Sequence, residues 1–102
     1  MSGLSGPVAE FLSREMGLTH KEFMRTLPAA VAPLQYRLQQ DAVTISHPAG
    51  SIEIRLQPAV ERRLGAFRLP VIPMQFHFHG LDEHQRREFL DRFDLHFQRG
   101  GG

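Results

Sequence analysis

The residues best suited to chemistry are three histidines, His77, His79 and His84. His77 and His79 are separated by one residue in a stretch that alternates polar and apolar positions, so both side chains should lie on the polar face of a strand. Imidazole nitrogen is a common zinc ligand, and two imidazoles on one strand with a third ligand make a workable tetrahedral site. The sequence therefore offers a metal or small-ligand site at this pair, with His84 as the third candidate ligand.

The expected geometry argues against His84 in that role. His77 and His79 should face away from the phenylalanines that alternate with them, whereas a helix that carries His84 should cover the apolar face. His84 would then reach the pair only around the edge of the sheet. A His-X-His pair also arises by chance in a chain with 6 histidines. The alternative interpretation is two solvated histidines on a polar strand face, and we expect no cofactor.

Arginines form the second group of candidates. Arg62, Arg63 and Arg68 fall between predicted strands, and Arg86 and Arg87 begin the last predicted helix. If the fold gathers them, their guanidinium groups could hold phosphate or the carboxylates of a partner. Neighbouring glutamates dilute such a patch, and the formal net charge of only +1 argues against nucleic acid as the partner.

An apolar stretch follows these arginines. Ile72 breaks the alternation of apolar and polar residues around it, and Pro73 cannot donate to a sheet ladder, which favours an edge position. Apolar residues beside arginines are typical of an interface core, although the segment could equally pack beneath the first helices. The predicted interaction surface comprises Arg62, Arg63, Arg68, Val71, Ile72 and Met74.

Motifs of catalysis are missing from the sequence, which has no nucleophile elbow, no His-Glu-X-X-His and no glycine-rich phosphate loop. Cysteine is absent, which excludes thiolate chemistry and fits a reducing compartment. Lys21 is the only lysine, a bias that a GC-rich bacterial genome would explain. We expect a cytoplasmic, non-enzymatic protein without a membrane segment.

The elements that must position these residues begin with two short helices. Apolar residues recur at helical spacing over residues 7–16, and Pro7 and Gly17 suit the two ends. The run 19–22, Thr-His-Lys-Glu, is a capping box that predicts a second helix. Pro28 is expected to end this helix at the preceding residue.

A period of two then predicts strands. Alternating apolar residues indicate an antiparallel meander over 34–38, 43–45 and 52–56, with tight turns between them. Residues 58–65 receive no assignment. Residues 67–71 are expected as an edge or a bent connection because of the prolines, and 74–78 as a further strand, continuous with it through Pro73.

The final element is a helix that begins after Asp82, with Gln85 at the return position of a capping box. Its apolar stripe should pack with the phenylalanines of the preceding strand. The sequence thus predicts one α+β domain over residues 1–102, with flexible tails at 1–6 and 99–102. It comprises two short N-terminal helices, an antiparallel meander of four to five strands and a C-terminal helix on one face.

This architecture does not by itself indicate an activity. The leading functional hypothesis is a protein-interaction or adaptor module that binds another protein or its own copy through the predicted interaction surface. The alternatives are a metal or small-ligand binder that uses the three histidines and, more weakly, nucleic-acid binding through arginine.

Overall fold

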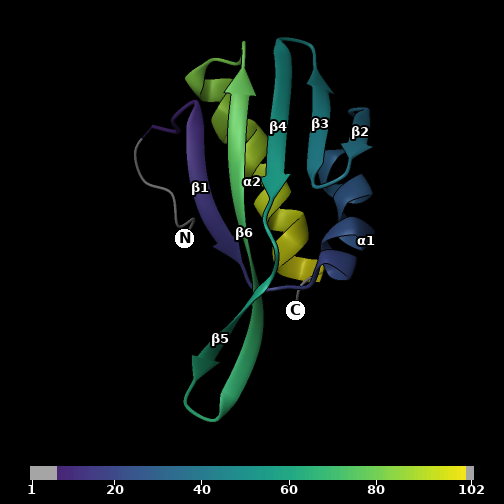
Figure 1. Cartoon of the computed structure of the whole chain (residues 1–102). Helices are drawn as coiled ribbons and strands as arrows, with labels where there is room; N and C mark the ends of the chain where they lie inside the picture. The colour runs from purple at the N-terminus through teal and green to yellow at the C-terminus, as the bar shows by residue number, and fades with distance from the viewer. Residues whose placement is uncertain (1–6, 101–102) are drawn as a thin grey trace.

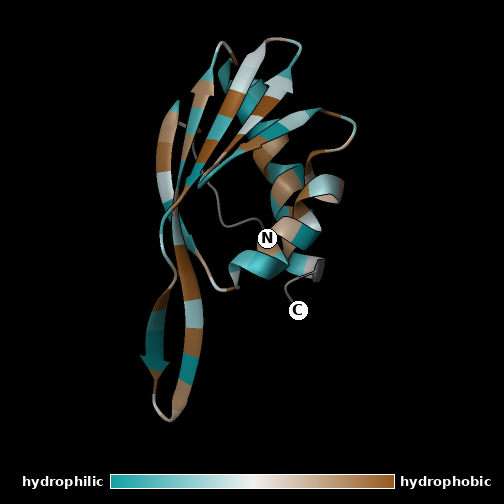
Figure 2. Ribbon diagram, turned by 45° about the vertical axis from the view of Figure 1, so that its right-hand side comes forward, coloured by the Kyte–Doolittle hydropathy of each residue, from teal (hydrophilic) through white to brown (hydrophobic). Residues whose placement is uncertain are grey.

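The computed structural model describes residues 7–100, with side chains as far as residue 98, and has two helices and six strands (Figure 1). The strands are β1 (Phe11–Met16), β2 (Tyr36–Gln39), β3 (Ala42–His47), β4 (Gly50–Leu56), β5 (Val60–Leu64) and β6 (Phe67–His79), and the helices are α1 (His20–Val31) and α2 (Glu83–Gly100). Both helices cover the same face of the sheet (Figure 2). The predicted α+β class with helices on one face and a C-terminal helix is therefore confirmed.

The sheet is antiparallel and has the strand order β1-β6-β4-β3-β2. Strands β2, β3 and β4 form the predicted meander, and β6 is inserted between β4 and β1. In this register Ile54 lies opposite Phe76 and Ile52 opposite Phe78, so apolar side chains alternate onto the helix-covered face. Strand β5 pairs with β6 alone.

The core lies between this face and α2, where phenylalanines dominate. Phe93 is fully buried, and its ring centroid lies 5.3 Å from that of Phe76 and 4.5 Å from that of Phe97. Phe23 of α1 stacks on Phe97 at 5.2 Å, which joins the two helices. The aromatic cluster thus packs both helices against the central strands, as the apolar stripe of the last helix predicts.

Residues 7–16 do not form the predicted first helix, because residues 11–16 are strand β1. Leu12, Arg14 and Met16 are half-buried while the residues between them are exposed, so the segment also fits a period of two. It pairs with residues 72–77 of β6. Without β1 that edge of β6 would present unpaired backbone groups, and this long-range pairing outweighs the local helical spacing.

Helix α1 starts as predicted but ends later. Thr19 accepts a hydrogen bond from the Glu22 amide at 3.1 Å, and the Glu22 carboxylate accepts one from the Thr19 amide at 2.8 Å. The predicted end before Pro28 is wrong, because the helix continues to Val31. Proline costs one hydrogen bond but keeps a helical φ, and burial of Ala30 and Val31 in the core offsets that loss.

Strand β6 is continuous over 13 residues, whereas the sequence indicated an edge or bent piece before Pro73. Pro70 pairs with β5 and Pro73 with β1. On its other side Pro73 only accepts a hydrogen bond, from the Gln57 amide at 2.9 Å, so its missing N–H is not needed there. The segment 58–65, left unassigned from the sequence, contains β5. The sheet therefore has six strands, not four to five.

Helix α2 begins at the predicted capping box, where the Gln85 amide donates to Asp82 Oδ1 at 2.8 Å and the Asp82 amide to Gln85 Oε1 at 2.9 Å. The predicted tails at 1–6 and 101–102 lie outside the described residues, and the backbone of residues 99–100 continues the helix. Among residues 7–100, no helix is both long and apolar enough to span a membrane.

Candidate functional site

The hairpin of β5 and the first part of β6, residues 60–71, projects beyond the helices and the other strands (Figures 1 and 2). We call it the arm. Its two strands pair only with each other from Val60 opposite Val71 to Leu64 opposite Phe67. Within residues 7–100, no other strand flanks the arm and no helix lies over it, so most of its side chains are available for contact.

The register of the arm separates apolar from charged side chains. Directly opposed residues share a face and consecutive pairs alternate faces. One face therefore carries the apolar residues and Arg62, while the other carries Glu61, Arg63, Arg68 and Pro70. The exposed fractions on the apolar face are 45% for Val60, 61% for Leu64, 72% for Phe67 and 43% for Leu69. This face therefore exposes several large apolar side chains next to one another.

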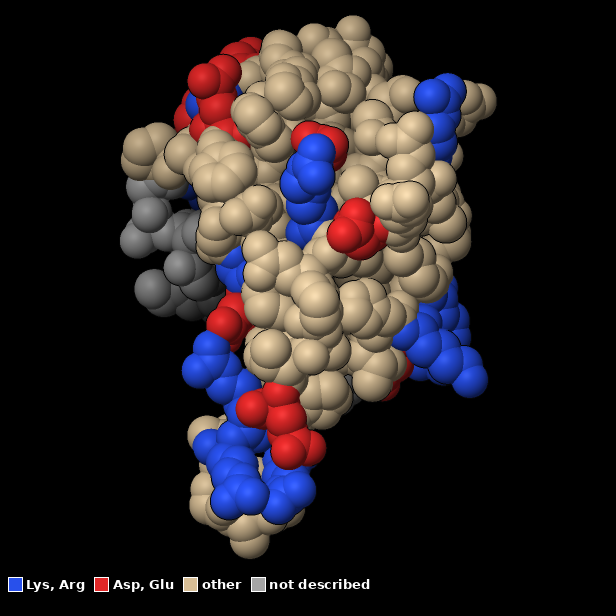
Figure 3. Space-filling view, in the orientation of Figure 1, with Lys and Arg blue, Asp and Glu red and all other residues tan. Residues whose placement is uncertain are grey.

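Positive charge gathers along the arm (Figure 3). Two of its arginines have carboxylate partners, since Arg62 forms an ion pair with Glu15 of β1 and Arg68 lies 3.7 Å from Glu61. All four of these side chains are well exposed, so solvent screens the pairs and each contributes little stability. The carboxylates lie toward the base of the arm, and Arg68 lies toward its tip.

The arginines of the predicted interaction surface lie exposed on the arm, whereas its C-terminal end needs correction. Arg62, Arg63 and Arg68 are exposed on the arm. Ile72 and Met74 are buried in the core cluster, and Val71 is 8% exposed, because β6 enters the body of the sheet at this point. The apolar part of the surface consists instead of Val60, Leu64, Phe67 and Leu69.

A second cluster lies on the open face of the sheet, opposite the helices. His77 and His79 of β6 have ring centroids 4.2 Å apart, as expected for neighbours on one strand face. Glu53 of β4 lies opposite His77 in the register. One ligand atom from each of the three residues lies within 4.8 Å of the others.

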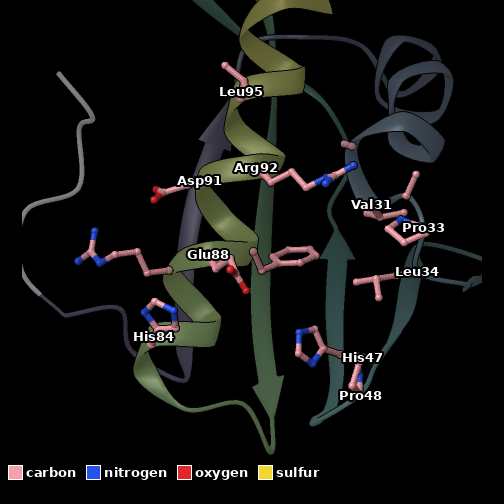
Figure 4. A pocket seen from close by; sticks show the side chains of 14 residues that line it. Val31, Pro33, Leu34, His47, Pro48, His84, Glu88, Asp91, Arg92 and Leu95 are labelled. Atoms are coloured by element: carbon pink, nitrogen blue, oxygen red, sulfur yellow. The ribbon is translucent and has the colours of Figure 1, made fainter.

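His84 does not join this cluster, because it lies on α2 and lines a groove on the helix-covered side of the sheet (Figure 4). Glu53 takes the third position instead. Sequence reasoning missed Glu53 because only the strand order and register reveal that it faces His77. The one available signal was its polar position in a strand of alternating residues.

The groove beside α2 has a volume of about 710 Å³ and lies between that helix, the end of α1 and the β3–β4 turn. Arg92 reaches across it toward Val31, while Asp91 points away (Figure 4). His47 lines it from the turn, where its Nδ1 accepts a hydrogen bond from the Ala49 amide at 3.0 Å. No cleft was expected from the sequence, because the domain is small. The groove therefore became evident only from the structure.

Comparison with known proteins found no matching protein-family model, no matching curated protein and no matching solved structure.

Proposed function

We propose that this chain is a protein-interaction module that pairs with a second copy of itself through the apolar face of the arm. The observation that carries the proposal is the row of exposed apolar side chains from Val60 to Leu69 on a hairpin that no other described element covers. Exposure of such a row to water is unfavourable, and a matching apolar face that covers the row removes this unfavourable exposure.

The arrangement of apolar side chains on one face of the arm favours a second copy as the partner. In a two-fold, antiparallel pairing of two arms, the tip of one arm lies beside the base of the other. On the apolar face, Leu64 and Phe67 lie at the tip and Val60 lies at the base. Leu64 and Phe67 of each copy therefore cover Val60 of the other, while Glu61, Arg63 and Arg68 stay in solvent on the opposite face of each arm.

The expected affinity is modest. Complete burial of a large apolar side chain contributes about 1.5–3 kcal/mol, and the four on each arm are already about half-covered. Both copies together then gain roughly 7–13 kcal/mol, against a cost of association of at least about 4 kcal/mol. The net value corresponds to a dissociation constant of roughly a micromolar or weaker.

Sedimentation velocity over a concentration series tests the proposal. The wild-type chain should shift from monomer to dimer between about 1 μM and several mM, the range that a net gain of roughly 3–9 kcal/mol implies. The double variant Leu64→Ser/Phe67→Ser should remain monomeric, whereas Arg68→Glu should leave the dimer in place, because Arg68 lies on the opposite face of the arm. Leu95→Ser is the matched control, because Leu95 is 48% exposed but lies on α2 away from the arm.

Two outcomes contradict the proposal. A wild-type chain that stays monomeric throughout the series excludes a second copy as the partner. A dimer that persists in the Leu64→Ser/Phe67→Ser variant shows that another surface mediates it. The alternative of nucleic-acid binding through arginine makes a different prediction. The chain would bind an oligonucleotide with an affinity that falls steeply as the salt concentration rises, and the Arg68→Glu variant would lose this binding.

A further inference from the structure

We infer that Glu53, His77 and His79 form a binding site for a divalent transition-metal ion, with zinc as the ion that fits best. The site lies on the open face of the sheet and uses none of the residues of the arm. It is therefore independent of the proposed pairing with a second copy.

The geometry brings the three donors close enough for a single ion. One ligand atom of each residue lies within 4.8 Å of the other two. Zinc binds imidazole nitrogen at about 2.0–2.1 Å and carboxylate oxygen at about 2.0–2.2 Å, so ligand atoms in one tetrahedron lie roughly 3–3.5 Å apart. Small rotations of the three side chains can shorten the separations between ligand atoms to this value, and the backbone does not need to move.

The donor set selects the class of ion. Two imidazoles and one carboxylate suit zinc and its neighbours in the first transition series, whereas calcium and magnesium prefer oxygen ligands. A tetrahedral ion would keep one position for water or an outside ligand, because the chain supplies three donors.

The sheet fixes the spacing of the donors. His77 and His79 are two residues apart on β6, so both point to the same face, and antiparallel pairing holds Glu53 directly opposite His77. These strands lie in the middle of the sheet, with β1 beyond β6 and β3 beyond β4. A ligand set on central strands is held more rigidly than one on loops.

Neighbouring side chains orient two of the ligands. The ring of Phe11 packs edge-on against His77, with centroids 5.6 Å apart and an interplanar angle of 84°. The Arg55 guanidinium lies 3.4 Å from the Glu53 carboxylate. The Arg55 side chain is 62% exposed, so it can swing into solvent when an ion arrives.

Isothermal titration calorimetry of the untagged chain with zinc chloride tests the site, because a polyhistidine tag would bind zinc itself. We expect one ion per chain. His79→Ala and Glu53→Gln should each weaken binding at least tenfold, since loss of a mere supporting contact already weakens metal sites by about 10–100-fold. His84→Ala is the matched control and should bind zinc like the wild type, because His84 lies in the groove.

Imidazole NMR spectra locate the ion independently of affinity. Zinc should shift the ring resonances of His77 and His79 and leave those of His47 and His84 in place. The inference is overturned if no binding occurs at millimolar zinc, if the His79→Ala variant binds as the wild type does, or if the ratio is one ion per two chains. All three variants change exposed or half-exposed side chains, and circular dichroism verifies that each remains folded.

Discussion

Replacement of Phe93 by alanine tests whether the aromatic cluster between α2 and the sheet is the main source of stability. Phe93 is fully buried and has ring contacts with Phe23, Phe76, Phe89 and Phe97. Its truncation removes a large apolar surface and leaves a cavity bounded by a sheet that cannot collapse. Such changes cost about 3–5 kcal/mol.

The loss expected for Phe93→Ala is a large fraction of the total free energy of unfolding. A chain of 102 residues is expected to have a free energy of unfolding of about 5–15 kcal/mol. Each kcal/mol corresponds to about 4–8 °C in Tm for a domain near this size, so Phe93→Ala should lower Tm by roughly 12–40 °C. A protein at the low end of this range would keep only about 0–2 kcal/mol, so up to about half of the variant molecules would be unfolded.

Urea unfolding followed by far-UV circular dichroism measures the effect, at a protein concentration where the chain is monomeric. Phe67→Ala is the control, because Phe67 is 72% exposed on the arm and its loss should change the free energy of unfolding by no more than about 0.5 kcal/mol. Equal losses in the two variants, or a loss below about 1 kcal/mol for Phe93→Ala, would refute the described packing.

Three further predictions concern the backbone and the first helix cap. In Gly50→Ala the new Cβ would lie 1.8 Å from the His79 carbonyl oxygen, so unfolding free energy should fall by more than about 1 kcal/mol, whereas Gly17→Ala should change it little. Thr19→Ala removes the cap of α1 and should cost about 0.5–2 kcal/mol in the same urea assay, and a smaller effect than this would contradict the capping role. Hydrogen bonds from the Thr19 backbone and hydroxyl lower the pKa of the Glu22 carboxyl from its ordinary value of 4.5. The stabilisation from this carboxylate is therefore complete above that pH and is lost as pH falls through the folded-state pKa; a carboxyl NMR titration with its midpoint at or above 4.5 would contradict this.

Elements with strong local signals were predictable from the sequence. Both capping boxes, at Thr19 and Asp82, are confirmed, because the cap and its return residue are only three positions apart. The meander is likewise confirmed, since short turns force neighbouring strands to pair. In these segments, residues that are close together in the sequence determine the structure.

The failures occur where a distant partner decides the outcome. Residues 11–16 have helical spacing but pair with β6, and residues 60–64 carry no alternation yet pair with residues 67–71. The candidate sites follow the same division. His77 and His79 were found because they share one strand, whereas Glu53 depends on a register that no local pattern encodes.

The position of β1 beside β6 also constrains how the chain is made. Phe11 pairs with His77, and the intervening segment takes roughly 3–13 s to synthesise at about 5–20 residues per second. During that interval β1 has no β6 with which to pair. The half-buried residues of β1 are thus exposed longest, and any delay in translation between these two strands prolongs the period in which β1 can pair wrongly.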